Sequence, residues 1–292
     1  MNTEASPIIY HPRSLSELLQ LRRRRPGVSI LAGGTYLMGA TLGGSGRLDR
    51  DLISLESVEE MHRLARSDRY LEIGAAATLD SVLLAFGSEL PPHLRRVLSD
   101  IGPLGVRSAA TLGGNLCVPD RLTTAVPALA ISDARVELRR SGGARWLRVE
   151  NLRNNGAGLD LRPGEVLTRI RIPRQAWTGY RYQQFGSPYS PVPPYLLFIG
   201  IYRSYRRVLD TIRVIFASRQ NALIRAAQWE REIAGTRLPL SEEQIQAALE
   251  GGSPLSQAEA IRGSLPFETE RQRELRGFRA KALLRDFLAS LR

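Results

Sequence analysis

Apolar and polar residues alternate in short blocks along the first sixty residues, and these blocks predict strands and helices in turn. Apolar stretches of strand length lie at residues 8–10, 28–32 and 52–55. After the first stretch, Ser14 and Glu17 match a capping box, in which the serine hydroxyl accepts a hydrogen bond from the backbone N–H of Glu17. Pro26 ends the helix that this box opens. The pattern predicts a βαβ-like unit whose second strand runs directly into Gly33 and Gly34.

A second set of elements begins near residue 61. Strands are predicted at residues 70–75, 134–138 and 166–172, and helices at 79–86, 91–100 and 123–131. Thr78 is the expected N-cap of the first of these helices. In the last strand, Ile170 and Ile172 share one face while Arg169 and Arg171 lie on the other, which is typical of a half-exposed sheet. A second double-glycine turn, within residues 109–116, is expected at the place in this unit that is equivalent to the first.

The chain changes character between residues 173 and 195, where prolines and tyrosines accumulate. This segment indicates a domain boundary or a long functional loop. Beyond it, two strands are predicted at 196–202 and 211–217, followed by helices. The last helix, at about 269–291, is expected to pack through Leu275, Phe278, Ala282, Leu283, Phe287 and Leu291. We therefore divide the chain into residues 1–60, 61–176 and 177–292.

The 292-residue composition excludes several classes of site. The single cysteine, Cys117, rules out an internal disulfide and a self-sufficient Fe–S cluster, which needs about four thiolate ligands. The three histidines are scattered and show no metal-ligand spacing. We therefore expect no metal site in this chain.

The net charge is +12, from 41 basic and 29 acidic residues. Such an excess can attract nucleic acid, anionic lipid or an acidic protein. No aromatic RNA-binding motif, zinc finger or basic-region heptad is present, so we interpret the charge as ionic contact with other subunits and expect no nucleic-acid binding. The first twelve residues lack the apolar core of a signal peptide, and the longest apolar stretch is too short to cross a bilayer. We expect a cytoplasmic protein without a membrane span.

The two double-glycine turns carry the candidate chemistry. Consecutive backbone N–H groups in such a turn form a concave nest that attracts anions. Two facing nests would hold a pyrophosphate, with Thr35, Thr111 and Asn115 as further donors. The alternative is that both turns are simply tight strand ends. Neither a GxGxxG fingerprint after a strand nor a Walker A motif is present, which excludes the classical Rossmann and P-loop classes.

Five motifs occur in an order and spacing that resemble a known family: LAGGTYLM at 31–38, EIGAAATLDSVL at 72–83, ATLGGNL at 110–116, VPALAISDARVEL at 126–138 and RPGEVLTRIRIP at 162–173. Together they are similar to the FAD-binding medium subunit of molybdenum hydroxylases, of the xanthine dehydrogenase and carbon monoxide dehydrogenase type. The resemblance implies an α+β fold. Two α/β subdomains would form a PCMH-type FAD-binding domain, followed by a small C-terminal domain of antiparallel strands and helices.

The resemblance also implies where FAD binds, with its pyrophosphate on the two glycine turns and the cofactor between the two subdomains. The implied cofactor-binding residues are Leu31, Ala32, Gly33, Gly34, Thr35, Tyr36, Leu37, Ile101, Thr111, Leu112, Gly113, Gly114, Asn115, Thr124 and Leu167. Ile101 and Leu167 have an alternative interpretation as ordinary core residues. No catalytic acid or base is implied.

This sequence departs from the family at several positions. Tyr36 and Thr124 stand where the family commonly has aspartate, and Gln184 and Ser187 stand nearest to its usual lysine and arginine. Because a threonine loses the charge-assisted hydrogen bond of an aspartate, FAD binding is expected to be weaker. Tyrosines in the segment 180–195 can supply a ring near the flavin or can simply pack that segment.

By resemblance, the chain is an electron-transfer subunit that does not oxidise substrate alone. The implied partners are a small [2Fe-2S] subunit and a large molybdopterin subunit, with electrons passing through FAD to NAD or another acceptor. One alternative is a degenerate, structural member that docks partners but binds FAD weakly or not at all. Another is a stand-alone flavin reductase resembling the cell-wall UDP-sugar reductase, for which we find no catalytic acid.

Overall fold

A computed structural model describes residues 7–42, 50–119, 122–154, 158–186, 196–217, 223–257 and 269–292. Ser187, Tyr189 and Tyr195 lie outside the described residues. The described chain contains both a parallel sheet and antiparallel sheets together with helices, so the expected α+β class is confirmed.

The N-terminal unit alternates strands and helices, as the hydrophobic pattern predicts. Its elements are β1 (Ile9–Tyr10), α1 (Leu15–Arg24), β2 (Ser29–Leu31), α2 (Thr35–Leu42) and β3 (Leu52–Ser54). The three strands form a parallel sheet in the order β1-β3-β2. Ser14 caps α1 by accepting from the Glu17 N–H at 3.2 Å, while the Glu17 carboxylate accepts from the backbone N–H of Arg13 at 2.8 Å rather than from Ser14.

The middle unit is built around a five-stranded sheet in the order β4-β5-β10-β6-β7, in which every neighbouring pair is antiparallel. Its elements are the short helix η1 (Glu59–Met61), β4 (Leu64–Arg66), β5 (Tyr70–Gly74), α3 (Leu79–Phe86), η2 (Gly87–Glu89), α4 (Pro92–Ser99), α5 (Leu104–Arg107), α6 (Leu112–Leu116), α7 (Ala125–Ile131), β6 (Arg135–Arg140), β7 (Gly143–Arg148), η3 (Val149–Leu152), β8 (Arg153–Asn154), β9 (Gly158–Leu159) and β10 (Val166–Pro173). β8 and β9 form a separate two-stranded sheet.

This arrangement corrects one expectation. The second double-glycine turn follows the helix α5 and opens the short helix α6, so it does not occupy the place in its unit that the first turn has after β2. The two units are not equivalent, because the strand that pairs with β5 is β10, which comes after the second turn in the chain. Hydrophobic alternation does not encode which strands pair, so the sequence pattern does not reveal this.

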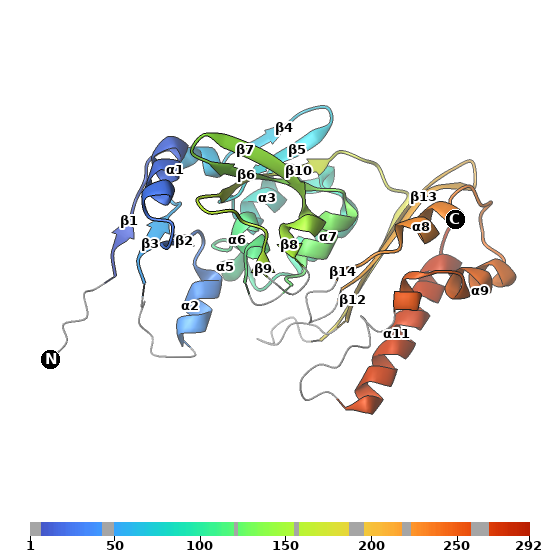
Figure 1. Ribbon diagram of the computed structural model, residues 1–292. Helices are drawn as coiled ribbons and strands as arrows, with labels where there is room; N and C mark the ends of the chain where they lie inside the picture. The colour runs from blue at the N-terminus through green and yellow to red at the C-terminus, as the bar shows by residue number, and fades with distance from the viewer. Residues whose placement is uncertain are drawn as a thin grey trace.

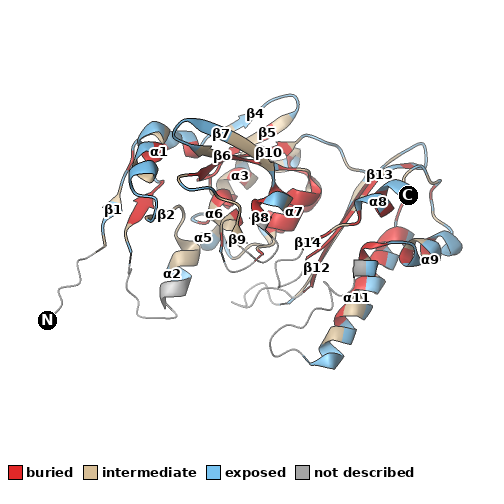
Figure 2. Ribbon diagram, viewed as in Figure 1, coloured by how far each residue is buried: buried red, intermediate tan, exposed pale blue. Residues whose placement is uncertain are grey.

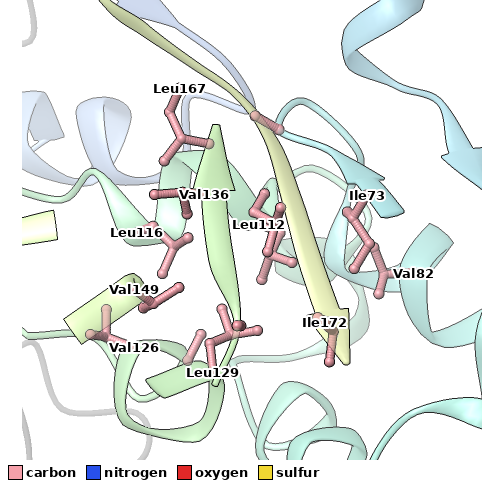
Figure 3. Close-up of a cluster of buried hydrophobic side chains, with 14 of the residues drawn as sticks. Ile73, Val82, Leu112, Leu116, Val126, Leu129, Val136, Val149, Leu167 and Ile172 are labelled. Atoms are coloured by element: carbon pink, nitrogen blue, oxygen red, sulfur yellow. The ribbon is translucent and has the colours of Figure 1, made fainter. Parts of the chain in front are cut away.

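One face of the five-stranded sheet forms the main core with α3, α6 and α7, which lie on one side of it (Figures 1 and 3). Val136, Leu138, Ile170 and Ile172 on the central strands are fully buried. Burying each such side chain stabilises the fold by roughly 1.5–3 kcal/mol. The same alternation that buries these residues places arginines on the opposite face of the sheet.

The C-terminal part is a four-stranded antiparallel sheet in the order β11-β12-β13-β14. Its elements are β11 (Gly179–Phe185), β12 (Leu196–Tyr205), β13 (Val208–Ala217), β14 (Leu223–Ile224), α8 (Ala227–Ile233), α9 (Glu242–Glu250), the short helix η4 (Pro254–Gln257) and α11 (Glu270–Ala289). One face, with Ile199 and Ile215, joins the main core, and the other face, with Phe198 and Phe216, packs against Phe287 of α11 in a second core. β11 lies in the segment that we interpreted as a boundary or a loop.

The stripe predicted for α11 is partly wrong. Leu275 and Phe278 are 43% and 72% exposed, whereas Leu283, Phe287 and Leu291 are buried as expected. The buried face is completed by Arg276 and by small or apolar residues further along α11 (Figure 2). A twenty-residue helix that packs through its C-terminal half leaves the apolar residues of its first turns in solvent. Among the described residues, no helix is long and apolar enough to traverse a bilayer.

Candidate functional site

The two glycine turns are brought into direct contact. A Cβ atom on Gly33 would lie only 1.8 Å from the carbonyl oxygen of Ala109, just before the second turn. A Cβ atom on Gly114 would lie 3.6 Å from the Cβ of Ala32 in the first turn. The two turns are far apart in sequence: the first joins β2 to α2 in the N-terminal unit, and the second follows α5 and opens α6 in the middle unit. Because glycine has no Cβ, their backbones approach more closely than any other residue would allow.

The first turn joins the end of β2 to the start of α2. Leu31 is anchored to the sheet through its carbonyl oxygen, which accepts from the N–H of Leu55 at 2.9 Å. Gly34 has a φ of +69°, in the left-handed region that favours glycine, and its carbonyl accepts from the N–H of Met38 at 2.8 Å. The first turn of α2 carries no acidic residue. Its amino end therefore offers N–H groups and a positive helix-dipole end to an anion.

The backbone amides of Gly33 and Gly34 donate to no acceptor among the described residues. Thr35 and Leu37 are half-buried in the first turn of α2, and Tyr36 between them makes contacts of its own. This turn therefore has the properties that the sequence predicts for an anion-binding nest.

The second turn is held rigidly by the segment before α3. The N–H of Leu112 donates to Ala77 O at 3.0 Å, and the N–H of Gly113 donates to Ala75 O at 2.9 Å. A Cβ atom on Gly113 would lie 2.6 Å from the Cβ and from the carbonyl oxygen of Ala75, so this position requires glycine. In return, the N–H of Leu79 donates to Ala110 O at 2.8 Å, which completes a β-bridge between Thr78 and Thr111.

The amides of the second turn are used within the chain, which differs from the nest that we expected there. The N–H of Gly114 donates to the Thr111 hydroxyl at 3.1 Å, and the N–H of Asn115 donates to the Thr111 carbonyl at 2.9 Å. Thr111 is thus the N-cap of α6. Its hydroxyl accepts one bond and keeps its own proton available to a ligand.

Asn115 supplies the remaining polar group at the second turn. Its side-chain oxygen Oδ1 is buried and has no hydrogen-bond partner among the described residues. A buried polar atom without a partner is costly, by about 1–3 kcal/mol, unless a ligand or water satisfies it. The backbone carbonyl of Asn115 accepts from the Thr123 hydroxyl at 3.1 Å, which fixes the start of α7 to this turn.

Thr124 occupies the N-cap position of α7, next to the Thr123 contact. It is half-buried, and its hydroxyl makes no capping bond to the helix. The side chain is therefore free of the usual N-cap role. We found Thr124 through the family resemblance; Thr123, which ties α7 to the second turn, carries no signal in the sequence that distinguishes it.

Ile101 and Leu167 pack against the main core. Ile101 follows α4 and is half-buried, while Leu167 is 5% exposed at the start of β10, opposite Leu138. Figure 3 shows Leu167 in the same apolar cluster as Leu116, the last residue of the helix α6 that starts at the second turn. Both residues therefore pack as ordinary core residues would. Their contact with a cofactor stays a prediction.

Gln184 lies on β11 and is held by a neighbour on the same strand. The hydroxyl of Tyr182 donates to Gln184 Oε1 at 2.8 Å. Burial raises the pKa of Tyr182 to about 12, and the nearby Asp100 carboxylate acts in the same direction, so the phenol stays protonated. Sequence reasoning treated this segment as a possible loop, because its strand character is masked by the surrounding prolines.

Cys117 lies directly after α6. Burial raises the pKa of its thiol to about 11, partly offset by the positive charge of Arg153. A protonated thiol is a poor metal ligand and a poor nucleophile. The described residues contain no cluster of histidine, cysteine or carboxylate side chains that could hold a metal ion.

The two touching turns carry groups that a ligand can use. They are the acid-free amino end of α2, the Thr111 hydroxyl and the Asn115 side-chain oxygen, and they lie on two turns whose backbones touch. Together they offer N–H and O–H donors to an anion and one acceptor to a hydroxyl or an ordered water.

Comparisons of sequence show the family of this chain. A family described as the FAD binding domain in molybdopterin dehydrogenase matches residues 3–175. Aldehyde oxidase 2 of Cavia porcellus is 32% identical over 195 residues, which is 62% of this chain and 14% of that protein. The xanthine dehydrogenase FAD-binding subunit of Escherichia coli O157:H7 is 24% identical over 169 residues, which is 57% of this chain and 58% of that protein. The alignment thus spans less than two thirds of either relative.

Two solved structures share the fold over nearly the whole chain. Quinoline 2-oxidoreductase from Pseudomonas putida 86 has a TM-score of 0.78 at 22% identity, covering 98% of this chain and 97% of that one. Carbon monoxide dehydrogenase from Oligotropha carboxidovorans has a TM-score of 0.78 at 21% identity, covering 97% and 96%. The resemblance that the sequence motifs indicate is confirmed. The chain belongs to the family of FAD-binding domains of molybdopterin dehydrogenases.

Proposed function

We propose that this protein is the FAD-binding electron-transfer subunit of a molybdopterin-dependent hydroxylase or dehydrogenase. The observation that carries the proposal is the contact between the two glycine turns, within a chain whose residues 3–175 match the family's FAD-binding domain. Relatives named as aldehyde oxidase and as a xanthine dehydrogenase FAD-binding subunit support a role in oxidation and reduction.

The cofactor-binding residues in this proposal come from both turns and their surroundings. The amino end of α2, formed by Gly33, Gly34 and Thr35, binds one part of the diphosphate through N–H groups. The Thr111 hydroxyl donates to the diphosphate from the second turn, while Asn115 Oδ1 accepts from a hydroxyl of the cofactor or from an ordered water. Ile101 and Leu167 provide apolar surface, and Thr124 a hydroxyl for the sugar alcohol. Bound FAD supplies the electron transfer, while the chain supplies binding and orientation.

The remaining residues of the predicted site complete the two turns as backbone or packing positions. These are Leu31, Ala32, Tyr36 and Leu37 in the first turn and Leu112, Gly113 and Gly114 in the second. In this proposal, residues 1–60 and 61–176 are the two halves that hold the cofactor, and residues 177–292 form the C-terminal domain. Their shared core supports a fixed arrangement of the parts.

Partner subunits complete the electron path. The chain has one cysteine and therefore cannot ligate an Fe–S cluster by itself. A small subunit with [2Fe-2S] clusters and a large molybdopterin subunit would deliver electrons to the FAD of this chain, from which NAD or another acceptor takes them. The chain is thus active only within a complex, and the substrate is chosen by the molybdenum subunit.

One observation favours a second candidate, a family member that docks partners but holds FAD weakly. The amides of the second turn are already used within the chain, and Thr124 offers no charge where the family commonly has aspartate. Each lost hydrogen bond to the cofactor costs roughly 1–3 kcal/mol, up to about a hundredfold in affinity.

The two candidates differ in what the native complex contains. We would purify the tagged chain from its host and measure flavin, iron and molybdenum per chain. Stoichiometric FAD together with iron and molybdenum supports the proposal. Iron and molybdenum without FAD, and no uptake of added FAD, support the second candidate. Absence of all three contradicts both.

A further inference from the structure

Three arginines stand directly opposite one another on the outer face of the five-stranded sheet. Arg135 on β6 is paired in register with Arg148 on β7 and with Arg171 on β10. The Arg148 and Arg171 side chains are 50% and 35% exposed, and Arg135 is exposed. Like charges directly opposite each other on neighbouring strands destabilise a sheet. This arginine row is therefore unfavourable for the isolated chain.

The row belongs to a sheet that carries a large excess of positive charge. The five strands of this sheet contain eight arginines and two glutamates, an excess of six positive charges and thus half of the net +12 of the chain. Five of these arginines lie on the outer face, because their neighbours along each strand are buried in the core. They are Arg135, Arg139, Arg148, Arg169 and Arg171. Figure 1 shows α3, α6 and α7 on the opposite, inner side of the sheet.

Carboxylates within the chain compensate only part of this charge. Glu72 on β5 is shared between Arg169, at 3.1 Å, and Arg171, at 2.7 Å. Arg148 reaches Glu150 at 3.2 Å, and Arg139 pairs with the buried Glu137 of the same face at 2.9 Å. Arg135, at the centre of the row, has no carboxylate within ion-pair distance among the described residues. Two of the three arginines of the row are therefore paired, at exposed or half-exposed positions where such pairs contribute about 0–1 kcal/mol, while the charge of Arg135 between them is not compensated among the described residues.

Aromatic rings hold the row in place and also limit what can bind there. The Arg171 guanidinium lies over the Trp146 ring at 4.2 Å and near the Tyr70 ring at 5.8 Å. One face of the Trp146 ring is thus occupied by a cation, which leaves less aromatic surface for stacking on the bases of a nucleic acid. An oriented, planar guanidinium suits the two oxygens of a carboxylate. The surface therefore favours an acidic protein over a nucleic acid.

We propose that the Arg148–Arg135–Arg171 row is the docking site for an acidic surface of a partner subunit. Carboxylates of the partner enter between the guanidinium groups, relieve their repulsion and become the favourable counterpart that the chain itself lacks. This inference rests on the proposed function, because it assigns to a specific sheet face the contact with the subunits that carry iron or molybdenum.

The test uses Arg135→Glu in the tagged chain expressed in its native host, with Arg231→Glu as a matched control. Arg231 is exposed on α8, in the C-terminal part, and its replacement changes the net charge by the same amount. We expect iron and molybdenum per chain to fall at least about tenfold in Arg135→Glu and to stay at the wild-type level in Arg231→Glu. The FAD content stays unchanged in both variants.

The isolated chain provides a second measurement that separates docking from folding. Arg135→Glu places a carboxylate between two arginines, so the unfolding free energy at low salt should be unchanged or higher. A fall in stability would show that Arg135 is a structural residue and would overturn the inference. Wild-type iron and molybdenum in Arg135→Glu, or equal loss in Arg231→Glu, would overturn it as well.

Failure of the proposed function looks different. In that case the wild-type chain itself carries neither FAD nor metal, whatever the state of Arg135. Binding of a single-stranded oligonucleotide that Arg135→Glu abolishes would assign the arginine row to nucleic acid and would likewise overturn docking of an acidic protein.

Discussion

Gly33 lies so close to Ala109 that a Cβ on the glycine would approach the alanine carbonyl oxygen to 1.8 Å. This contact joins the N-terminal parallel sheet to the segment that leads into the second glycine turn. The proposed dinucleotide site between the two units depends on this contact. A residue that separates these backbones would also separate the groups to which we assign diphosphate binding.

Gly33→Ala should therefore weaken FAD binding at least about tenfold, because the backbone must shift to admit the methyl group. Gly39→Ala is the control, since a Cβ there meets nothing within 4 Å and alanine favours the helix α2. Dissociation constants from flavin fluorescence titration measure the effect. Equal affinity in the two variants would show that the contact between the turns is not needed for binding.

Thr111→Val removes the hydroxyl that caps α6. The N–H of Gly114 then loses its acceptor at 3.1 Å, and the unfolding free energy should fall by about 1 kcal/mol. FAD affinity should fall as well, because the valine cannot donate a hydrogen bond to the cofactor. Thr111→Ser keeps the hydroxyl and should preserve both properties in urea unfolding and in titration. If Thr111→Val loses stability but binds FAD normally, Thr111 serves only the helix.

The local elements were largely predictable from the sequence, while their pairing was not. Ser14, Thr78 and Ser241 cap helices because hydroxyl side chains at these positions satisfy N–H groups of the next turn, a relationship that spans only three residues. The insertion of β10 between β5 and β6 depends on contacts between distant residues, such as Ile170 with Ile73 of β5 and with Val136 of β6. Nothing in the alternation of either strand encodes that choice.

In the candidate site, too, the sequence predicts local features but not the contacts between distant segments. The sequence pointed to Gly33 and Gly113, since double glycines after apolar stretches are rare without a conformational reason. It predicted free amides at both turns, yet those of Leu112 and Gly113 donate to Ala77 and Ala75. That outcome depends on how the segment before α3 lies across the second turn, which only the tertiary structure determines.

Thr124→Asp should strengthen FAD binding, by up to about tenfold, because a carboxylate accepts a stronger, charge-assisted hydrogen bond than a hydroxyl does. Thr124 makes no capping bond, so the change leaves the start of α7 intact, and an aspartate is well tolerated at this N-cap position. Isothermal titration of both proteins with FAD gives the comparison. Unchanged or weaker binding would indicate that Thr124 does not face the cofactor.

A buried ion pair should make stability depend on pH in the acidic range. Arg145 binds the Glu165 carboxylate through two bonds, at 2.8 and 2.9 Å. Burial acts to raise the pKa of Glu165, but the bonds from Arg145 and from the N–H of Arg162 outweigh it and hold that pKa below its ordinary value. The stabilisation is complete above the ordinary carboxyl pKa and is lost as the pH falls from there through the lower pKa of the folded protein.

Glu165→Gln should accordingly lower the unfolding free energy by about 1–3 kcal/mol at neutral pH, and the difference from wild type should shrink as the solution becomes acidic. Glu242→Gln is the control, because Glu242 pairs with Arg285 at an exposed position where such pairs contribute little. Urea unfolding of the three proteins at neutral and at acidic pH provides the values. A difference for Glu165→Gln that does not change with pH would rule out this linkage.

The central claim is that paired glycine turns bind the diphosphate of a dinucleotide. The most direct test compares FAD with riboflavin in the presence of adenosine, because these two ligands supply the ring system and the nucleoside of FAD without its diphosphate. Calorimetric titration of the wild-type chain should show FAD binding at least about a hundredfold more tightly than riboflavin with adenosine present, since the charge-assisted bonds to the phosphates are lost. Equal affinities for FAD and for riboflavin with adenosine, or no binding of FAD, would contradict the account.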